Sequence, residues 1–268
     1  MKTPLVSIIM STYNGSKYIT FSIESVLTQS YKNFEFIIIN DCSDDDVEKI
    51  IQPYIKRDSR IVYKKNKKNL KLTKSLNFGL SMAKGKYIAR VDDDDTWSLN
   101  KLEKQVDFME SHKEHGLCGS NYMIIDQDGK RLHLQKMRLK DKDIKNHLLQ
   151  SNQFAHSSII MRKISLEKAG GLYNPTLNGV EDYDLWLRIG KISKLANINE
   201  TLMEYRFLPN SAMRKNALRR RILSFKVAIM HRDGYPNFIK SFILRMPWLI
   251  LNDSTFSKVL ALKDKLFK

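Results

Sequence analysis

Two kinds of hydrophobic pattern alternate along the first 110 residues of the chain. Short apolar runs rich in Val, Ile, Phe and Tyr predict β-strands, and between them apolar residues recur every three or four positions, which predicts amphipathic helices. The strands are expected within residues 5–15, 34–41, 60–66 and 86–95, and the helices within residues 16–31, 42–55, 72–85 and 96–110. Apolar strands that alternate with helices predict a parallel, doubly wound α/β sheet.

The pattern also predicts how individual helices begin and which face they bury. Ser43 or Asp44 is placed to cap the helix within residues 42–55. In the helix within residues 96–110, helical spacing predicts one apolar face. That face is formed by Leu99, Leu102, Val106 and Met109.

Length and cysteine content limit the class of protein. A chain of 268 residues can form one sizeable α/β domain, alone or with an appendage. Cys42 and Cys118 are too few for a disulfide framework and indicate a reducing compartment. The first apolar run gives way to a polar turn before an export-type core appears, so no signal peptide is predicted and a cytoplasmic location is expected.

Positive charge is concentrated near the end of the chain. The formal net charge is +17, and residues 201–268 hold 14 Lys or Arg against 4 Asp or Glu, a net charge of +10. Such a patch suits nucleic acid, anionic lipid or a phosphorylated substrate, and charge alone does not choose among them. No nucleic-acid-binding module is recognisable in the sequence.

Four consecutive aspartates, residues 92–95, stand against this positive excess. A solvated turn or a helix cap is the common explanation of an acidic run. Here, however, the aspartates follow a buried strand, and ligands of open α/β sheets gather at the carboxyl ends of strands. Adjacent carboxylates also repel one another, so a bound cation explains the cluster better.

Two other strand ends and one later acidic segment carry candidate chemistry. Ser11 and Tyr13 lie in "STYNG" at the end of the first strand, and Asp41 in "NDCSDD" at the end of the second can accept hydrogen bonds from a base or ribose. The later segment, "NGVEDYDLWLRIGK", holds Glu181, Asp182 and Asp184. It reads either as an ordinary acidic helix start or as a functional site.

The sequence resembles the family 2 glycosyltransferases, inverting enzymes of the GT-A fold. Four segments carry the resemblance in the right order, and together they span about residues 4–213. They are "PLVSIIMSTYNGSKYITFSIESVLTQSYKNFEFIIINDCSDD", "LTKSLNFGLSMAKGKYIARVDDDDTW", "HSSIIMRK" and "GVEDYDLWLRI". The resemblance implies a Rossmann-like, mostly parallel sheet flanked by helices, followed by a basic helical appendage.

The resemblance also implies roles at the donor site. Asp41 would recognise the uracil of a UDP-sugar, with Ser11 and Tyr13 packing around the nucleotide. Asp94 would coordinate Mn²⁺ or Mg²⁺ directly, with Asp95 as a further ligand, and Asp92 would hold the ribose or bind the metal directly or through a water.

In the acceptor half, the resemblance makes Asp182 the general base, with Glu181 orienting the acceptor or the base. Single displacement with inversion would then turn an α-linked UDP-sugar into a β-glycoside. Many relatives carry a histidine where this chain has Leu208, so Arg206, Arg214 or Lys215 would supply the positive charge at the diphosphate instead. His156 is expected to be structural.

The implied organisation is a catalytic domain over residues 1–213, with a nucleotide-binding half of about residues 1–97 and an acceptor half of about residues 98–213, followed by a basic, partly amphipathic helical segment over residues 214–268. That segment, with Trp248, either lies on an anionic membrane or packs on the catalytic domain. It is too short and too interrupted to span a bilayer.

The predicted reaction is transfer of a hexose from a UDP-sugar to a polyprenyl-diphosphate-linked saccharide in O-antigen or capsule biosynthesis, at the inner face of a bacterial cell membrane. Glucose is the first expectation for the sugar, before galactose or an N-acetylhexosamine. The alternatives are a sugar nucleotidyltransferase, which should show a glycine-rich phosphate loop that "STYNGSKY" lacks, and a basic nucleic-acid-binding protein.

Overall fold

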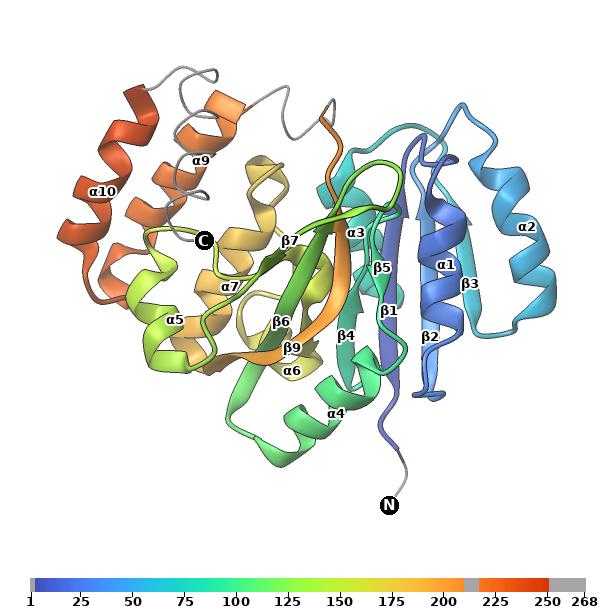
Figure 1. Ribbon diagram of the computed structural model, residues 1–268, viewed down its shortest axis with the longest axis horizontal. Coiled ribbons are helices and arrows are strands. Elements are labelled where there is room, and N and C mark those ends of the chain that lie inside the picture. The colour runs from blue at the N-terminus through green and yellow to red at the C-terminus, as the bar shows by residue number, and fades with distance from the viewer. Residues whose placement is uncertain (1–2, 210–216, 251–268) are drawn as a thin grey trace.

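One nine-stranded sheet organises the chain in the computed structural model, which describes residues 3–209 and 217–250, the side chains of 248–250 excepted (Figure 1). The strands follow one another in the order β3-β2-β1-β4-β8-β6-β9-β5, and β7 pairs with β6. They are β1 (Val6–Thr12), β2 (Phe34–Asn40), β3 (Ile61–Lys65), β4 (Tyr87–Arg90), β5 (Thr96–Trp97), β6 (His115–Ile125), β7 (Arg131–Gln135), β8 (Ile160–Arg162) and β9 (Lys194–Arg206).

The sheet has a parallel half and a mixed half. Strands β3, β2, β1 and β4 are parallel neighbours, as the alternating pattern predicts. Beyond β4 the direction changes, because β8 pairs antiparallel with both β4 and β6, while β6 and β9 form a long parallel pair. Strands β5 and β7 are also antiparallel to their neighbours. The prediction of a mostly parallel α/β sheet flanked by helices is confirmed.

Helices cover both faces of the sheet, because side chains alternate along each strand. Ile8 and Met10 of β1 face one hydrophobic cluster, which includes α1, α2 and α4, whereas Ile9 faces the other, which includes α3, α5, α6 and α7. The helices are α1 (Ile19–Leu27), α2 (Val47–Arg57), α3 (Leu72–Met82), α4 (Lys101–Ser111), α5 (Asp141–Leu148), α6 (Lys163–Lys168), α7 (Glu181–Ile192), α9 (Ala217–Met230) and α10 (Phe238–Ile250).

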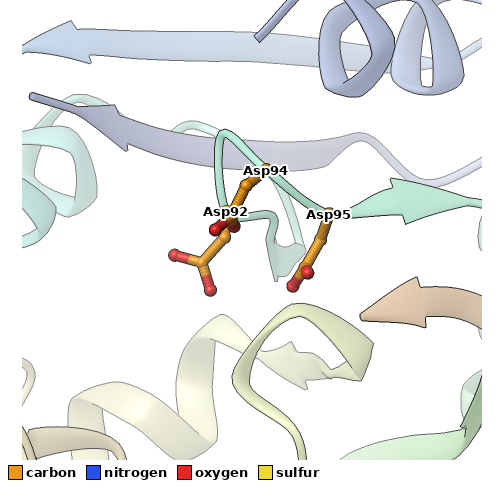
Figure 2. A group of neighbouring side chains, drawn as sticks. All are labelled: Asp92, Asp94 and Asp95. Atoms are coloured by element: carbon orange, nitrogen blue, oxygen red, sulfur yellow. The ribbon is translucent and has the colours of Figure 1, made fainter. Parts of the chain in front are cut away.

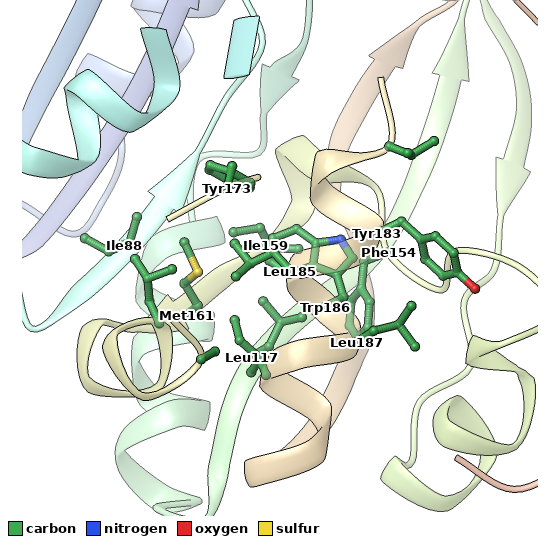
Figure 3. Packing of buried hydrophobic residues seen from close by; sticks show 14 of the residues in the cluster. Ile88, Leu117, Phe154, Ile159, Met161, Tyr173, Tyr183, Leu185, Trp186 and Leu187 are labelled. Atoms are coloured by element: carbon green, nitrogen blue, oxygen red, sulfur yellow. The ribbon is translucent and has the colours of Figure 1, made fainter. Parts of the chain in front are cut away.

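The hydrophobic cluster that includes Ile9 is centred on α7. Trp186 is fully buried and packs edge-on against Phe154, and Leu185, Leu187 and Ile189 are fully buried beside it (Figure 3). Burying a large aromatic with several aliphatic side chains fixes the helix firmly, since each contributes roughly 1.5–3 kcal/mol. The acidic residues at the start of α7 are therefore held on a rigid element.

The helices α9 and α10 pack side by side at the end of the molecule opposite α2 (Figure 1). Val227 and Ala228 of α9 join the hydrophobic cluster around α7, as does Tyr235, whose hydroxyl donates to the Leu187 carbonyl at 2.6 Å. No helix in residues 3–209 and 217–250 is long and apolar enough to cross a membrane. The predicted boundary between residues 213 and 214 lies outside the described residues, as does the basic stretch 251–268.

Two finer expectations are wrong. Helix α2 begins after Asp46 rather than after Ser43 or Asp44, and the side chain that accepts from the N–H of its first residue, Val47, is that of Asp45, at 3.2 Å. Leu99 is 63% exposed, since it lies in the turn before α4 begins at Lys101. The remaining members of the predicted face are buried, namely Leu102, Val106 and Met109.

Candidate active site

The predicted donor residues meet at one edge of the sheet. Strands β2, β1 and β4 are adjacent and parallel, so their carboxyl ends lie together. Ser11 is buried near the end of β1, and Tyr13, the first residue after this strand, is 48% exposed. Asp41 follows β2 and is buried, and its backbone N–H donates to the Thr12 carbonyl at 2.8 Å.

The turns after β1 and β2 are locked together by their own side chains. Asn14 and Cys42 both adopt left-handed backbone conformations, with φ of 57° and 62°. The Asn14 side chain accepts from the Asp44 N–H at 2.9 Å, and the Asn14 N–H donates to the Ser43 hydroxyl at 3.1 Å. These crossed hydrogen bonds offset the strain of the left-handed residues and fix the two turns against each other.

Asp41 is held by a polar network rather than by a charge. Its Oδ1 accepts from the Asn66 side-chain amide at 2.7 Å and from the Leu70 N–H at 2.8 Å. Asn66 also donates to the Ser75 hydroxyl at 2.8 Å, which links this network to α3. Fully satisfied buried networks are rigid, so the carboxylate has a fixed position at the strand end.

The four aspartates occupy the turn between β4 and β5. One oxygen each from Asp92, Asp94 and Asp95 lies within 4.8 Å of the others (Figure 2). Asp93 instead accepts a hydrogen bond from the Thr12 hydroxyl at 2.6 Å. A side chain at position 15 would collide with the Asp93 carboxylate, since a Cβ on Gly15 would lie 2.1 Å from its Oδ2. The turn thus brings the carboxylates of Asp92, Asp94 and Asp95 together and directs that of Asp93 to Thr12.

Asp92 forms an ion pair with a buried arginine. Both of its carboxylate oxygens accept hydrogen bonds from the guanidinium of Arg90, which is 2% exposed. Burial by itself would lower the pKa of Arg90, but the charge and hydrogen bonds of Asp92, together with other acidic neighbours, outweigh burial and raise that pKa. The Ser157 hydroxyl accepts from the Asp92 N–H at 3.0 Å and donates to Oδ2 at 3.1 Å. The orientation of Asp92 is therefore fixed.

Asp94 and Asp95 hold charge poorly on their own. Burial, followed by the charges of the neighbouring aspartates, raises the pKa of Asp94 to about 9. Burial and the Asp92 charge raise the pKa of Asp95 to about 7. Asp95 Oδ1 accepts from the Arg206 N–H at 3.0 Å, whereas its buried Oδ2 has no hydrogen-bond partner among the described residues.

These residues fit a divalent cation. Carboxylate oxygens are the donors that hard ions such as Mg²⁺ and Mn²⁺ prefer. A cation would complete the coordination of the unpartnered Asp95 oxygen and would favour the ionised forms of Asp94 and Asp95.

A second acidic cluster opens α7. Asp182 accepts a hydrogen bond from the Asn152 side-chain amide at 2.8 Å, and burial raises its pKa. Glu181 accepts from the Gly179 N–H, and burial together with the Asp182 charge raises the pKa of Glu181 to about 7. A carboxylate in a desolvated site, with a pKa raised towards neutrality, has the properties of a general base.

Asp184 differs from its two neighbours. It accepts from His231 Nε2 and from Arg188 Nε, both at 2.9 Å. Burial by itself would raise the pKa of Asp184, but these two partners outweigh burial and lower the pKa. Asp184 therefore pairs with Arg188 within α7 and joins this helix to His231, just after α9, so it is part of the structural framework.

Tyr173 and His156 lie between the two acidic clusters. His156 Nε2 and the Tyr173 hydroxyl are 2.8 Å apart, and the His156 ring packs edge-on against Trp186. Burial raises the pKa of Tyr173, and the charges of Asp182 and Asp92 add to that rise, so both clusters lie within electrostatic reach of its hydroxyl. His156 is in the structural setting that the sequence predicts.

Arg206 is committed to the aspartate turn. Its Nε donates to the Asp94 carbonyl at 3.1 Å, its Nη1 donates to the Asp126 and Gln127 carbonyls at 3.2 Å, and its guanidinium lies over the Tyr18 ring. These contacts hold the turn from the end of β9. Leu208 is described and lies beyond this strand, whereas Arg214 and Lys215 lie outside the described residues.

Sequence reasoning missed Arg90, Ser157 and Asn152. A signal was present for Arg90, because residues two apart in a strand face the same side, and a cation in an apolar strand two positions before Asp92 predicts an ion pair. No comparable signal exists for Ser157 or Asn152, which come from a different part of the chain.

Comparisons with known proteins identify the family of this chain. The model of the glycosyl transferase family 2 matches residues 7–170. An uncharacterized glycosyltransferase of Methanocaldococcus jannaschii is 38% identical over 214 residues, which cover 78% of this chain and 73% of the relative. The putative teichuronic acid biosynthesis glycosyltransferase TuaG of Bacillus subtilis is 34% identical, over 78% of this chain and 81% of the relative.

Solved structures agree on the fold. S. aureus TarS in complex with UDP-GlcNAc superposes with a TM-score of 0.67 and 17% identity, over 88% of this chain and 72% of that chain. The mannosyltransferase PcManGT from Pyrobaculum calidifontis, in complex with GDP-Man and Mn²⁺, superposes with a TM-score of 0.68 and 15% identity, over 99% of this chain and 81% of that chain. With the family model covering most of the chain and these relatives matching it over most of their length, this protein belongs to the family 2 glycosyltransferases.

Proposed function

We propose that this glycosyltransferase moves a hexose from a UDP-sugar to a hydroxyl of a lipid-linked saccharide, with inversion at the sugar's C1. The observation that carries the proposal is the cluster of Asp92, Asp94 and Asp95 at the same sheet edge as Asp41. A site that gathers carboxylates for a cation beside a fixed hydrogen-bond acceptor suits a nucleotide whose diphosphate needs charge neutralisation.

The donor is bound by residues of the parallel half of the sheet. Asp41 accepts hydrogen bonds from the uracil, and Ser11 and Tyr13 pack around the nucleoside. Asp94, with Asp95, would hold Mn²⁺ or Mg²⁺, and the bound cation would supply the positive charge that the two phosphates and the departing UDP require. Asp92, whose oxygens are shared with Arg90, holds the ribose or reaches the cation through a water.

The chemistry at the acceptor is assigned to the start of α7. Asp182 takes the proton of the acceptor hydroxyl while the acceptor oxygen bonds to C1 and the bond from C1 to the UDP oxygen breaks. Asn152 fixes one oxygen of Asp182, and Glu181 lies beside it to orient the acceptor or the base. An α-linked donor then gives a β-glycoside. Arg206 acts by holding the aspartate turn, and its predicted contact with the nucleotide stays part of this proposal.

The acceptor and the location follow from charge and from the relatives. TuaG of Bacillus subtilis carries a polysaccharide biosynthesis name, and EpsE of the same species, a putative glycosyltransferase, is 38% identical to this chain. A basic chain suits a polyprenyl-diphosphate saccharide at the inner face of the bacterial membrane, as in O-antigen or capsule assembly. Glucose is the first sugar proposed, before galactose or an N-acetylhexosamine.

GDP-mannose is a second candidate donor. The mannosyltransferase from Pyrobaculum calidifontis aligns with 99% of this chain and binds GDP-Man. Guanine, like uracil, presents N–H donors to a carboxylate such as Asp41, so this residue does not by itself exclude the purine.

The test is a panel of UDP-sugars and GDP-mannose incubated with the protein and Mn²⁺, with released nucleoside diphosphate measured. We expect UDP release from a UDP-hexose, and a rise in melting temperature with UDP plus Mn²⁺ but not with single-stranded nucleic acid. Release of GDP from GDP-mannose alone would move the donor assignment to the second candidate. If no sugar nucleotide in the panel is hydrolysed or stabilises the protein, the proposed donor site is wrong.

A further inference from the structure

Helix α10 buries an arginine while several of its large apolar side chains are exposed to solvent. Arg245 points into the protein, where its guanidinium donates to the Gln150 carbonyl at 2.8 Å, the Ser224 carbonyl at 2.8 Å and the Tyr183 hydroxyl at 2.9 Å. Ser241, one turn earlier on the same side, is also buried. Ser241 and Arg245 therefore lie on the packed side of α10, together with the half-buried rings of Phe238 and Phe242.

The apolar side of α10 faces solvent. Ile239 is 74% exposed and Ile243, one turn later, is 62% exposed. Leu244 and Met246 are exposed as well, and the charged member of this surface is Lys240. Soluble proteins rarely leave neighbouring large apolar side chains uncovered, and such a surface usually marks a binding site for lipid or protein.

This orientation is fixed by packing. The Phe242 ring makes tilted contacts with the rings of Phe225 in α9 and of Phe238, whose centroids are 5.1 Å and 5.9 Å away. A rotation of α10 that buried the two isoleucines would break these ring contacts and expose the Arg245 hydrogen bonds, so the apolar surface cannot be withdrawn by a local change.

We propose that the surface formed by Ile239, Lys240, Ile243, Leu244 and Met246 inserts into the boundary between headgroups and acyl chains of an anionic bilayer. The positive net charge of the chain favours an anionic bilayer over a second copy of the protein as the occupant of this surface. The chain carries a net charge of +17, so a second copy would bring like charges together, whereas an anionic surface attracts them. The proposal rests on the proposed function, because it names the surface that brings the enzyme to a lipid-linked acceptor.

The shape of this region suits the boundary of a bilayer. An open groove of about 770 Å³ lies along α10. Its lining residues are Asn237, Phe238, Ile239, Lys240, Ile243 and Leu244. Four apolar side chains, with Lys240 and Asn237 as the polar members, match the environment just below phosphate headgroups, where alkyl chains are buried while an amine stays at the charged surface.

The experiment compares full-length Ile239→Ser/Ile243→Ser with wild-type protein in sedimentation with vesicles of phosphatidylglycerol and phosphatidylcholine. The matched control is Ile164→Ser/Ile192→Ser, which removes two isoleucines of similar exposure, 53% and 50%, from α6 and α7. We expect wild type and control to bind, less tightly as salt rises and weakly to pure phosphatidylcholine. The α10 variant should bind vesicles at least about tenfold more weakly, since it lacks the two isoleucines that would be buried in the bilayer.

Three results would overturn the inference. The first is vesicle binding by the α10 variant that equals that of wild type, and the second is wild-type binding to neutral vesicles that equals binding to anionic ones. The third is that wild type and control are dimers in lipid-free buffer while the α10 variant is a monomer, which would make a second copy the occupant. Release of UDP from a UDP-sugar in solution is measured for all three proteins and should be unchanged. Wild-type protein that releases UDP but does not bind vesicles would reject this inference alone, and wild-type protein that binds vesicles but releases no UDP would reject the proposed function alone.

Discussion

Asp94 lies in the site where a negative charge is hardest to hold without a cation. Its pKa is raised to about 9 by burial and by three neighbouring acids, and the proposed metal would offset both effects. Asp94→Asn keeps the size of the side chain and removes the charge. We expect turnover to fall by at least about two orders of magnitude, roughly 2.7 kcal/mol in the barrier, with an unchanged melting temperature.

Metal removal gives the matching measurement. EDTA should abolish activity, and added Mn²⁺ or Mg²⁺ should restore it in the wild type and in Asp128→Asn, a control in an exposed turn. Titration with Mn²⁺ should show tight binding that Asp94→Asn lacks. Full activity in EDTA would reject the metal assignment.

Asp41 and Asp182 should fail in different ways when changed. Asp41→Ala removes the hydrogen-bond acceptor proposed for uracil, so it should mainly weaken UDP-sugar binding. It should also lower stability somewhat, because the N–H donors of Asn66 and Leu70 lose their partner. Asp182→Asn should leave donor binding near normal and depress turnover. Steady-state kinetics and calorimetry with UDP separate the two. Wild-type turnover in Asp182→Asn would move the base to Glu181, because Asp184 is held by His231 and Arg188.

At the scale of elements, α3 joins the donor site to the segment before α7. Asn77 donates to the Tyr173 carbonyl at 2.8 Å and accepts from the Tyr173 N–H at 2.9 Å, and Thr73 donates to the Asn178 side chain at 3.0 Å. Glycines with positive φ, Gly171 and Gly179, flank this segment. One helix thus contacts both the Asp41 network, through Ser75, and the chain that leads to Asp182.

Asn77→Ala should release this segment. The loss of two hydrogen bonds to one backbone unit should cost roughly 1–3 kcal/mol, raise hydrogen exchange in residues 171–179 and slow transfer to acceptor, while affinity for UDP is kept. Ser81→Ala, an exposed position on the same helix, is the control. Unchanged exchange and transfer in Asn77→Ala would show that the segment is positioned by its other contacts.

Local patterns predicted the elements of the parallel half but not those of the mixed half. Strands β1 to β4 are apolar runs such as "VSIIMST", which hydrophobicity alone reveals. β5 has two residues and exists because Thr96 and Trp97 pair with Glu204 and Met203 of β9, a partner that no nearby sequence indicates.

The same distinction holds for the site. The strand-end acids were predictable from their position after apolar runs, whereas their supports come from distant segments. Ser157 reaches Asp92 across 65 positions, and Asn152 reaches Asp182 across 30. Such contacts depend on how the sheet is ordered, which a short-range pattern does not contain.

For the whole molecule, the C-terminal helices are part of the folded body rather than a loose tail. Arg245 joins α10 to α7 through Tyr183 and to α9 through Ser224. Arg245→Met keeps the length of the side chain but leaves buried acceptors without donors. We expect the free energy of unfolding to fall by roughly 2–4 kcal/mol. Arg219→Met, at an exposed site on α9, should change it by less than about 0.5 kcal/mol. Equal melting temperatures for both variants would contradict this integration.

The left-handed turn at Cys42 has a practical consequence. This thiol is partly accessible beside Asp41, while Cys118 is fully buried in the core. A maleimide should therefore modify the unmutated protein at one position, next to the proposed nucleotide site. Because a bound sugar nucleotide would shield that thiol, the labelling rate should fall with ligand concentration. The labelling rate of Cys42, followed by mass spectrometry, would therefore report the occupancy of the proposed donor site before any acceptor has been identified.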